Sequence, residues 1–97
     1  MSTYTKKTVI VWDKATYSSM LGDQAPSEAN LEFHAKRLEM VAAGKMADEG
    51  GVTISNTQVT STKQFINEES AQEWINFNDV HASKYNFTKI SSQIISI

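Results

Sequence analysis

The sequence predicts an α+β fold in which strands and helices follow in the order β-α-β-β-α-β. A β-branched and aromatic run, Thr8 to Trp12, stands near the start and is typical of a strand. Two stretches with helical spacing of apolar residues come later, each behind a capping residue. The second is the clearest, because the N-cap candidate Asn67 precedes Glu68 and Glu69, which favour the positive end of the helix dipole.

The predicted second helix, between Asn67 and Asn86, carries a broad aromatic face. Steps of about 100° per residue place eight side chains on one arc. They are Ala71, Trp74, Ile75, Phe77, Asn78, His81, Ala82 and Tyr85. Asn78 and His81 are the polar exceptions on that arc, and Val80 is the apolar exception on the opposite side. We therefore expect this helix to pack on a sheet.

The predicted first helix, residues 28 to 49, follows the N-cap candidate Ser27 and ends before Gly50-Gly51. Its main apolar stripe comprises Leu31, His34, Ala35, Leu38, Val41, Ala42 and Met46. A second stripe, Phe33, Met40 and Ala47, lies nearly opposite. The main stripe is expected to cover the sheet. The second stripe then needs another partner to cover it, either the 13–26 segment or a second subunit. Its three residues are therefore interface candidates.

The remaining elements are a connection and three strands. Tyr17, Met20 and Leu21 predict a short helix or an ordered loop between residues 13 and 26, with Gly22 as its terminator. Alternation in Val52 to Ile54 predicts a half-buried strand, and a parity break at Val59 places a hairpin turn near residues 55 to 58. Strands at 59–66 and 87–97 complete the set.

This order is that of the split βαβ, or ferredoxin-like, fold: a four-stranded antiparallel sheet with two helices on one face. Its usual strand order, 4-1-3-2, puts residues 8–12 at the centre, as their apolar character on both sides requires. Packing of two sheets in a homodimer would cover the other face. The alternative is a solvated face, which is favoured by its polar residues Thr60, Thr62, Gln64, Ser91 and Ser92.

Length, net charge and residue composition argue against several classes of function. A chain of 97 residues is expected to form one domain, with residues 1–7 frayed. The net charge of −2 gives no electrostatic argument for binding nucleic acid or an anionic membrane. There is no cysteine and no apolar run of membrane-spanning length, so we expect a cytoplasmic protein. The excess of lysine over arginine is typical of an AT-rich bacterial or phage genome. A phage source would place the protein in the virion or host cytoplasm.

Motifs for catalysis are missing: there is no GxxxxGK[ST], GxSxG or HExxH. We expect no catalytic residue, metal or cofactor. One candidate pocket remains, because the predicted fold brings two histidines and several aromatic side chains to one end. Its residues are Trp12, His34, Trp74, Asn78, His81 and Tyr85. Imidazoles there could serve as ligands or a base. The alternative is two structural histidines at the edge of an aromatic core.

The pattern Phe65…Glu68…Ala71…Trp74, after a strand, resembles the antibiotic-biosynthesis-monooxygenase-like dimeric α/β barrels. The resemblance implies a homodimer with a small cavity between each sheet and its helices. Some members oxidise aromatic polyketides or degrade haem with an Asn, a Trp and a His. Here TVIVW lacks the Asn and His81 lies beyond the position of their histidine, so no catalytic role is carried over.

Three functional hypotheses follow. The first is a non-enzymatic structural or interaction module that acts as a homodimer, of bacterial or phage origin. The second is a small-ligand-binding, monooxygenase or haem-handling dimeric barrel. The third, an RNA-recognition sheet, is disfavoured because the strand VTSTKQF lacks stacking aromatic residues.

Overall fold

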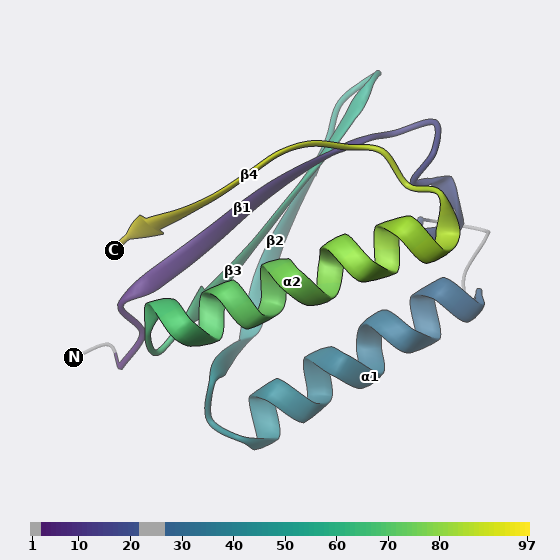
Figure 1. Cartoon of the computed structure of the whole chain (residues 1–97). Helices are drawn as coiled ribbons and strands as arrows, with labels where there is room; N and C mark the ends of the chain where they lie inside the picture. The colour runs from purple at the N-terminus through teal and green to yellow at the C-terminus, as the bar shows by residue number, and fades with distance from the viewer. Residues whose placement is uncertain (1–2, 22–26) are drawn as a thin grey trace.

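The structure is a computed structural model that describes residues 3–21 and 27–97. Its elements are β1 (Lys6–Asp13), a 3₁₀ helix η1 (Ser18–Met20), α1 (Glu28–Ala42), β2 (Met46–Ile54), β3 (Gln58–Phe65), α2 (Glu68–Tyr85) and β4 (Lys89–Ser96). This order confirms the predicted β-α-β-β-α-β arrangement, with one short helical turn after the first strand (Figure 1).

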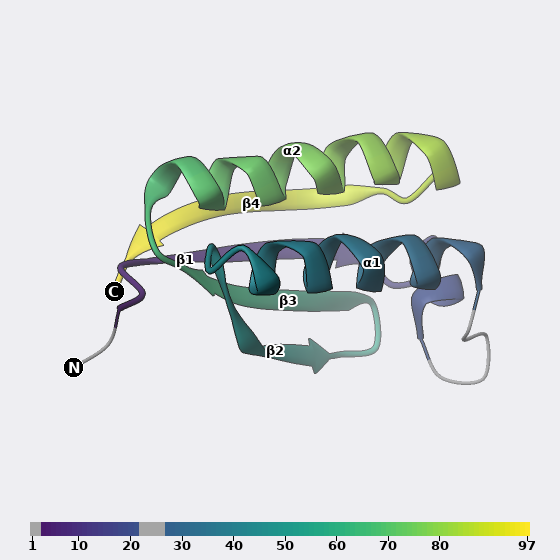
Figure 2. The same cartoon turned by 90° about the horizontal axis from the view of Figure 1, so that it is seen from below.

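The four strands form one antiparallel sheet in the order β2-β3-β1-β4. The β1 strand is central, as its apolar sequence predicts, and pairs with β3 and β4 along nearly its whole length. Both helices lie on the same side of the sheet (Figures 1 and 2). The buried residues Thr8, Ile10 and Trp12 alternate along β1, so one face of the strand points to the helices and the other does not.

The two ends of α2 follow the predicted signals. The side chain of Asn67 accepts a hydrogen bond from the backbone N–H of Ser70 at 2.8 Å. At the other end Asn86 adopts the left-handed conformation, with φ of 61°, and its backbone N–H donates to the carbonyl of Ala82. The predicted aromatic face packs on the sheet, with Trp74 1% exposed.

The first helix ends earlier than the sequence predicts. Ser27 caps its start as expected, accepting from the backbone N–H of Asn30 at 3.1 Å. The helix ends at Ala42, where Gly44 with φ of 75° reverses the chain. Residues 46–49 belong to β2, which pairs with β3. The predicted stop, Gly50-Gly51, therefore lies inside a strand.

The predicted assignment of the two α1 stripes is wrong, because the helix is turned the other way. Met40 is 1% exposed and Phe33 packs on Trp74 with ring centroids 5.2 Å apart. Leu31 and Leu38 are 59% and 56% exposed. The orientation buries a large aromatic ring and a methionine. It also leaves Lys36 and Arg37 beside the core edge, where they pair with carboxylates of neighbouring elements.

The segment after β1 forms the predicted ordered turn. Tyr17 stacks on Trp12 with ring centroids 4.9 Å apart and an interplanar angle of 12°. Met20, in η1, is also buried, and Leu21 packs against the core. Gly22 and Pro26 lie outside the described residues. The hairpin turn predicted near residues 55 to 58 is present between β2 and β3, closed by a 2.9 Å bond from the N–H of Ser55 to the carbonyl of Gln58.

Candidate functional site

His81 lies at the centre of the aromatic cluster that the sequence predicts as a pocket. Its ring is 3% exposed and packs against Phe77, Tyr85 and Phe87, with centroid distances of 5.3, 5.0 and 5.5 Å. The Nε2 atom lies 2.9 Å from the carbonyl oxygen of Ala29, to which it donates as N–H. Burial holds the pKa of His81 below its usual value. The ring therefore ties α2 to the first turn of α1 as a neutral imidazole.

Of the other five predicted pocket residues, Tyr85 contacts the His81 ring directly, and Trp74 reaches it through Phe77. Trp12 reaches His81 through Phe87, whose ring contacts both. Asn78 is buried and donates to the backbone carbonyl of Trp74 at 2.8 Å. His34 lies elsewhere, next to Phe33 on α1 and within 3.5 Å of Arg37 Nε. Trp12, Trp74, Asn78 and His81 are packed side chains with 1–3% exposure. A ligand role for the six residues stays a prediction.

The three predicted interface residues lie inside the protomer. Met40 and Ala47 are buried, and Phe33 packs against the core. Ala47 belongs to β2 and not to the helix. The exposed apolar side chains of α1 are Leu31 and Leu38. Because the helix faces the sheet with the other stripe, any docking through α1 would use these leucines.

A larger uncovered surface is the helix-free face, which is the side of the sheet opposite α1 and α2. Strand alternation and the pairing register assign its residues. They are Lys7, Val9, Val11, Thr60, Thr62, Gln64, Ser91, Gln93 and Ile95. Val9 and Val11, on the central strand, are half-buried by their neighbours, and Ile95 is 39% exposed. Within the described residues, no helix or strand covers this face (Figure 1).

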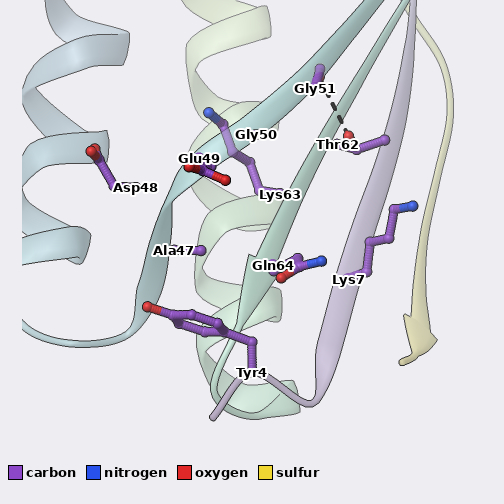
Figure 3. A pocket seen from close by; sticks show the side chains of 10 residues that line it. All are labelled: Tyr4, Lys7, Ala47, Asp48, Glu49, Gly50, Gly51, Thr62, Lys63 and Gln64. Atoms are coloured by element: carbon purple, nitrogen blue, oxygen red, sulfur yellow. Dashed lines mark hydrogen bonds between the residues drawn. The ribbon is translucent and has the colours of Figure 1, made fainter. Parts of the chain in front are cut away.

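A hollow of about 480 Å³ opens where β2 separates from β3, and we call it the bulge hollow (Figure 3). The register shifts between Met46, opposite Phe65, and Gly50, opposite Lys63, so residues 47–49 lack partners in the pairing. The lining residues are Tyr4, Lys7, Ala47, Asp48, Glu49, Gly50, Gly51, Thr62, Lys63 and Gln64. The volume lies in the range of small-molecule sites.

Both glycines of the bulge hollow allow close approach of β3. A Cβ atom on Gly50 would stand 2.6 Å from Lys63 Nζ and 2.8 Å from the backbone oxygen of Thr62. A Cβ atom on Gly51 would stand 2.7 Å from Thr62 Oγ1, which donates to the Gly51 carbonyl at 3.4 Å. The side chain of Lys63 thus crosses Gly50, as Figure 3 shows. The hollow has its shape because residues 50 and 51 lack side chains.

Lys63 borders this hollow from β3, but its register partner Thr8 faces the helices, so the Lys63 side chain points to the helix side of the sheet. Its side chain is half-buried, and no carboxylate lies within 4.0 Å of its ammonium group among residues 3–21 and 27–97. Desolvation lowers the pKa of Lys63, and the nearby guanidinium of Arg37 lowers it further. The carboxylate of Asp48, which pairs with Arg37 at 2.8 Å, acts in the opposite sense and raises the pKa of Lys63.

Sequence reasoning missed the bulge hollow because it placed Gly50-Gly51 at the end of a helix. The available signal was the adjacent pair of glycines directly before the alternating run Val52 to Ile54, which is also a signature of a bulged strand. Lys63 carries no signal of its own in the sequence. Its environment arises from burial and from Arg37 of α1, which only the fold brings near it.

Nowhere in residues 3–21 and 27–97 do three or more His, Cys, Asp or Glu side chains come together in a way that could hold a metal ion. In the same residues, no helix is long and apolar enough to cross a membrane.

Comparison with known proteins places the chain by its fold. No family model matches it, and no curated protein matches it. It is similar to the crystal structure of a dimeric ferredoxin-like protein from an uncultured marine organism, with a TM-score of 0.54 and 10% sequence identity. The match covers 98% of this chain and 89% of that one. The protein is thus a small ferredoxin-like α+β protein, as its element order predicts.

Proposed function

We propose that this protein is a non-enzymatic interaction module that acts as a homodimer through the helix-free face of its sheet. The observation that carries the proposal is the uncovered centre of this face, where Val9 and Val11 project from the central strand, with Ile95 farther along β4 opposite Lys7. A sheet with both helices on one side leaves such residues in water unless another layer covers them. The dimeric state of the similar marine protein supports a second copy as that layer.

The size of the face fits this role. With strands about 4.8 Å apart and a rise of about 3.3 Å per residue, four strands of about eight residues span roughly 19 by 26 Å. Two such faces would bury roughly 1,000 Å² in total, which is about where specific interfaces begin. Threonines flank the valines, and their methyl groups and hydroxyls suit a mixed interface. We expect a dimer of modest affinity.

The lysine-rich composition supports a bacterial or phage source, and we place the module in the cytoplasm of the cell or infected host. An accessory protein that acts through its surface needs no set of catalytic residues. The burial of Trp74, Asn78 and His81 in the protein interior agrees with such a role.

Sedimentation velocity on the full chain tests the dimer. The wild type should sediment as a dimer at micromolar concentration, and Ile95→Glu should shift it to the monomer, because covering the face removes the hydration of the new carboxylate. Val11→Glu is the second variant, at the centre of the face. The matched control is Leu38→Glu, which places the same charge on an exposed leucine of α1.

Two results would contradict the proposal. One is a wild-type monomer throughout the accessible concentration range. The other is a dimer that survives Ile95→Glu and Val11→Glu in folded protein but dissociates in Leu38→Glu, which would move the interface to α1.

A further inference from the structure

A second hollow, of about 140 Å³, lies on the helix side of the sheet beside η1, and we call it the η1 hollow. Its strand residues are Val52, Val59 and Ser61. Val59 pairs with the buried Trp12 and Ser61 with the buried Ile10, so both side chains project toward the helices. Val52, opposite Ser61 on the edge strand β2, projects to the same side and is 62% exposed. The hollow therefore opens to solvent along this edge of the sheet.

The other walls of the η1 hollow come from α1 and from the turn around η1. They are formed by Asn30, Phe33 and His34 of α1 and by Tyr17, Met20 and Leu21. The i, i+3, i+4 spacing places the three α1 residues on one side of the helix. Ser27 Oγ donates to the carbonyl of Ser19 at 2.6 Å, which holds η1 against the start of α1. Of the six predicted pocket residues, only His34 lines this hollow.

The lining of the η1 hollow favours a neutral, largely apolar ligand. Among the described residues it contains no Asp, Glu, Lys or Arg, and the pKa of His34 is lowered by burial, so its imidazole is neutral near pH 7. A charged ligand would lose hydration there without gaining an ion pair. Ordered water needs about two to four polar partners, and a dry apolar cavity of about 150 Å³ accommodates benzene. The volume therefore suits a single six-membered ring.

Two hydroxyl groups add a polar feature to this lining. Tyr17 and Ser61 are 5% and 7% exposed. Neither hydroxyl makes a hydrogen bond to the residues that the structure describes. A buried hydroxyl without a partner costs free energy, and a hydroxyl can both donate and accept. A ligand that carries a hydroxyl of its own is therefore favoured over a purely apolar one.

We propose that the η1 hollow binds a small neutral molecule with one six-membered ring and a hydroxyl group, of which phenol is a simple example. The ring would make van der Waals contacts that the apolar lining now lacks, and the hydroxyl would bond to Tyr17 or Ser61. This site goes beyond the proposed dimer, because it lies on the opposite side of the sheet from the helix-free face.

Methyl NMR on the full chain tests the site with phenol as the probe and with benzene and sodium benzoate for comparison. Phenol should give saturable shifts of the Met20, Val52 and Val59 methyl groups at millimolar concentration, since so small a ligand binds weakly. Benzene should bind at the same place about threefold or more weakly, because it lacks the hydroxyl. Benzoate should give no saturable shift there. Phenol shifts that are absent, unsaturable or centred elsewhere overturn the proposal, as does equal affinity for benzene or saturation by benzoate.

Two substitutions on β3 separate the hollow from general effects on the protein. Ser61→Ile fills part of the hollow with an apolar side chain, so it should raise the dissociation constant of phenol about tenfold or more. The matched control, Thr60→Ile, alters the neighbouring residue on the helix-free face and should leave that constant unchanged. Unchanged affinity in folded Ser61→Ile overturns the proposal.

A substitution at the mouth of the hollow serves if Ser61→Ile does not fold. Val52→Glu changes an exposed side chain and replaces part of the apolar wall with a hydrated carboxylate. It should raise the dissociation constant of phenol about threefold or more. Unchanged affinity in this variant also overturns the proposal.

The test is independent of oligomeric state. Ile95→Glu, which should be monomeric under the dimer proposal, retains every lining residue of the η1 hollow. It should bind phenol with the dissociation constant of the wild type. A wild-type monomer that binds phenol overturns the dimer alone, and a wild-type dimer that does not bind phenol overturns this site alone.

Discussion

At the scale of single residues, Thr8 shows a buried polar group without a partner. The residue is 0% exposed, and its Oγ1 atom makes no hydrogen bond to the residues that the structure describes. A valine has nearly the same shape and no hydroxyl to desolvate. Thr8→Val should therefore raise the free energy of unfolding by about 1 kcal/mol, measured by urea denaturation. A loss of stability would show that the hydroxyl has a partner, such as an ordered water.

His81 gives the molecule a pH dependence with a definite sign. Burial lowers its pKa in the folded state below the unfolded value of about 6.5. Between the two values the unfolded chain binds more protons, so the free energy of unfolding falls as the pH falls from about 7. Above the unfolded pKa both states are neutral and this contribution is constant. Urea denaturation at several pH values should show the decline.

His34 contributes with the same sign, since burial and Arg37 lower its pKa as well. His34→Gln is therefore the control variant, and the slope that persists in it belongs to His81. The ion-paired carboxylates Glu32 and Glu73 have lowered pKa values and lose their contribution only in more acidic solution, near and below their usual pKa. Stability independent of pH between 7 and 5 would contradict the assignment.

At the scale of elements, α1 shows that two apolar stripes on one helix do not reveal which stripe is buried. The first stripe has the three-residue and four-residue spacings, and the second repeats at seven residues, from Phe33 to Met40. The choice is made by the partners: Phe33 meets Trp74, Lys36 meets Glu73 at 2.9 Å, and Arg37 meets Asp48. The first two contacts come from α2, which is distant in sequence, and the third comes from β2, which follows α1 directly.

The orientation of α1 predicts a contrast between two truncations. Met40→Ala should lower the free energy of unfolding by about 2–5 kcal/mol, because it opens a cavity in the core. Leu38→Ala, on the exposed stripe, should change it by no more than about 0.5 kcal/mol. Chemical denaturation of both variants under identical conditions measures the difference. Equal losses, or a larger loss for Leu38→Ala, would mean that the helix faces the sheet with its other stripe.

At the scale of the whole molecule, the proposed dimer links stability to concentration. If folded protomers associate and unfolded chains do not, the melting temperature should rise as protein concentration increases from about 1 to 100 μM. Ile95→Glu should remove this dependence and Leu38→Glu should keep it. Differential scanning calorimetry measures both. A melting temperature independent of concentration in the wild type would argue for a stable monomer with a hydrated sheet face.

The sequence by itself determined the element order, the central position of β1, the caps at Ser27, Asn67 and Asn86, and the inner face of α2. These follow from local chemistry: capping side chains, β-branched runs, and one aromatic face too apolar to point outward. Only the tertiary structure decided where α1 ends, which of its stripes is buried, and that a bulge opens a hollow between β2 and β3. In those cases local preferences permit two solutions. Pairing of β2 with β3 selects the end of α1 and the bulge, and contacts with α2, distant in the chain, select the buried stripe.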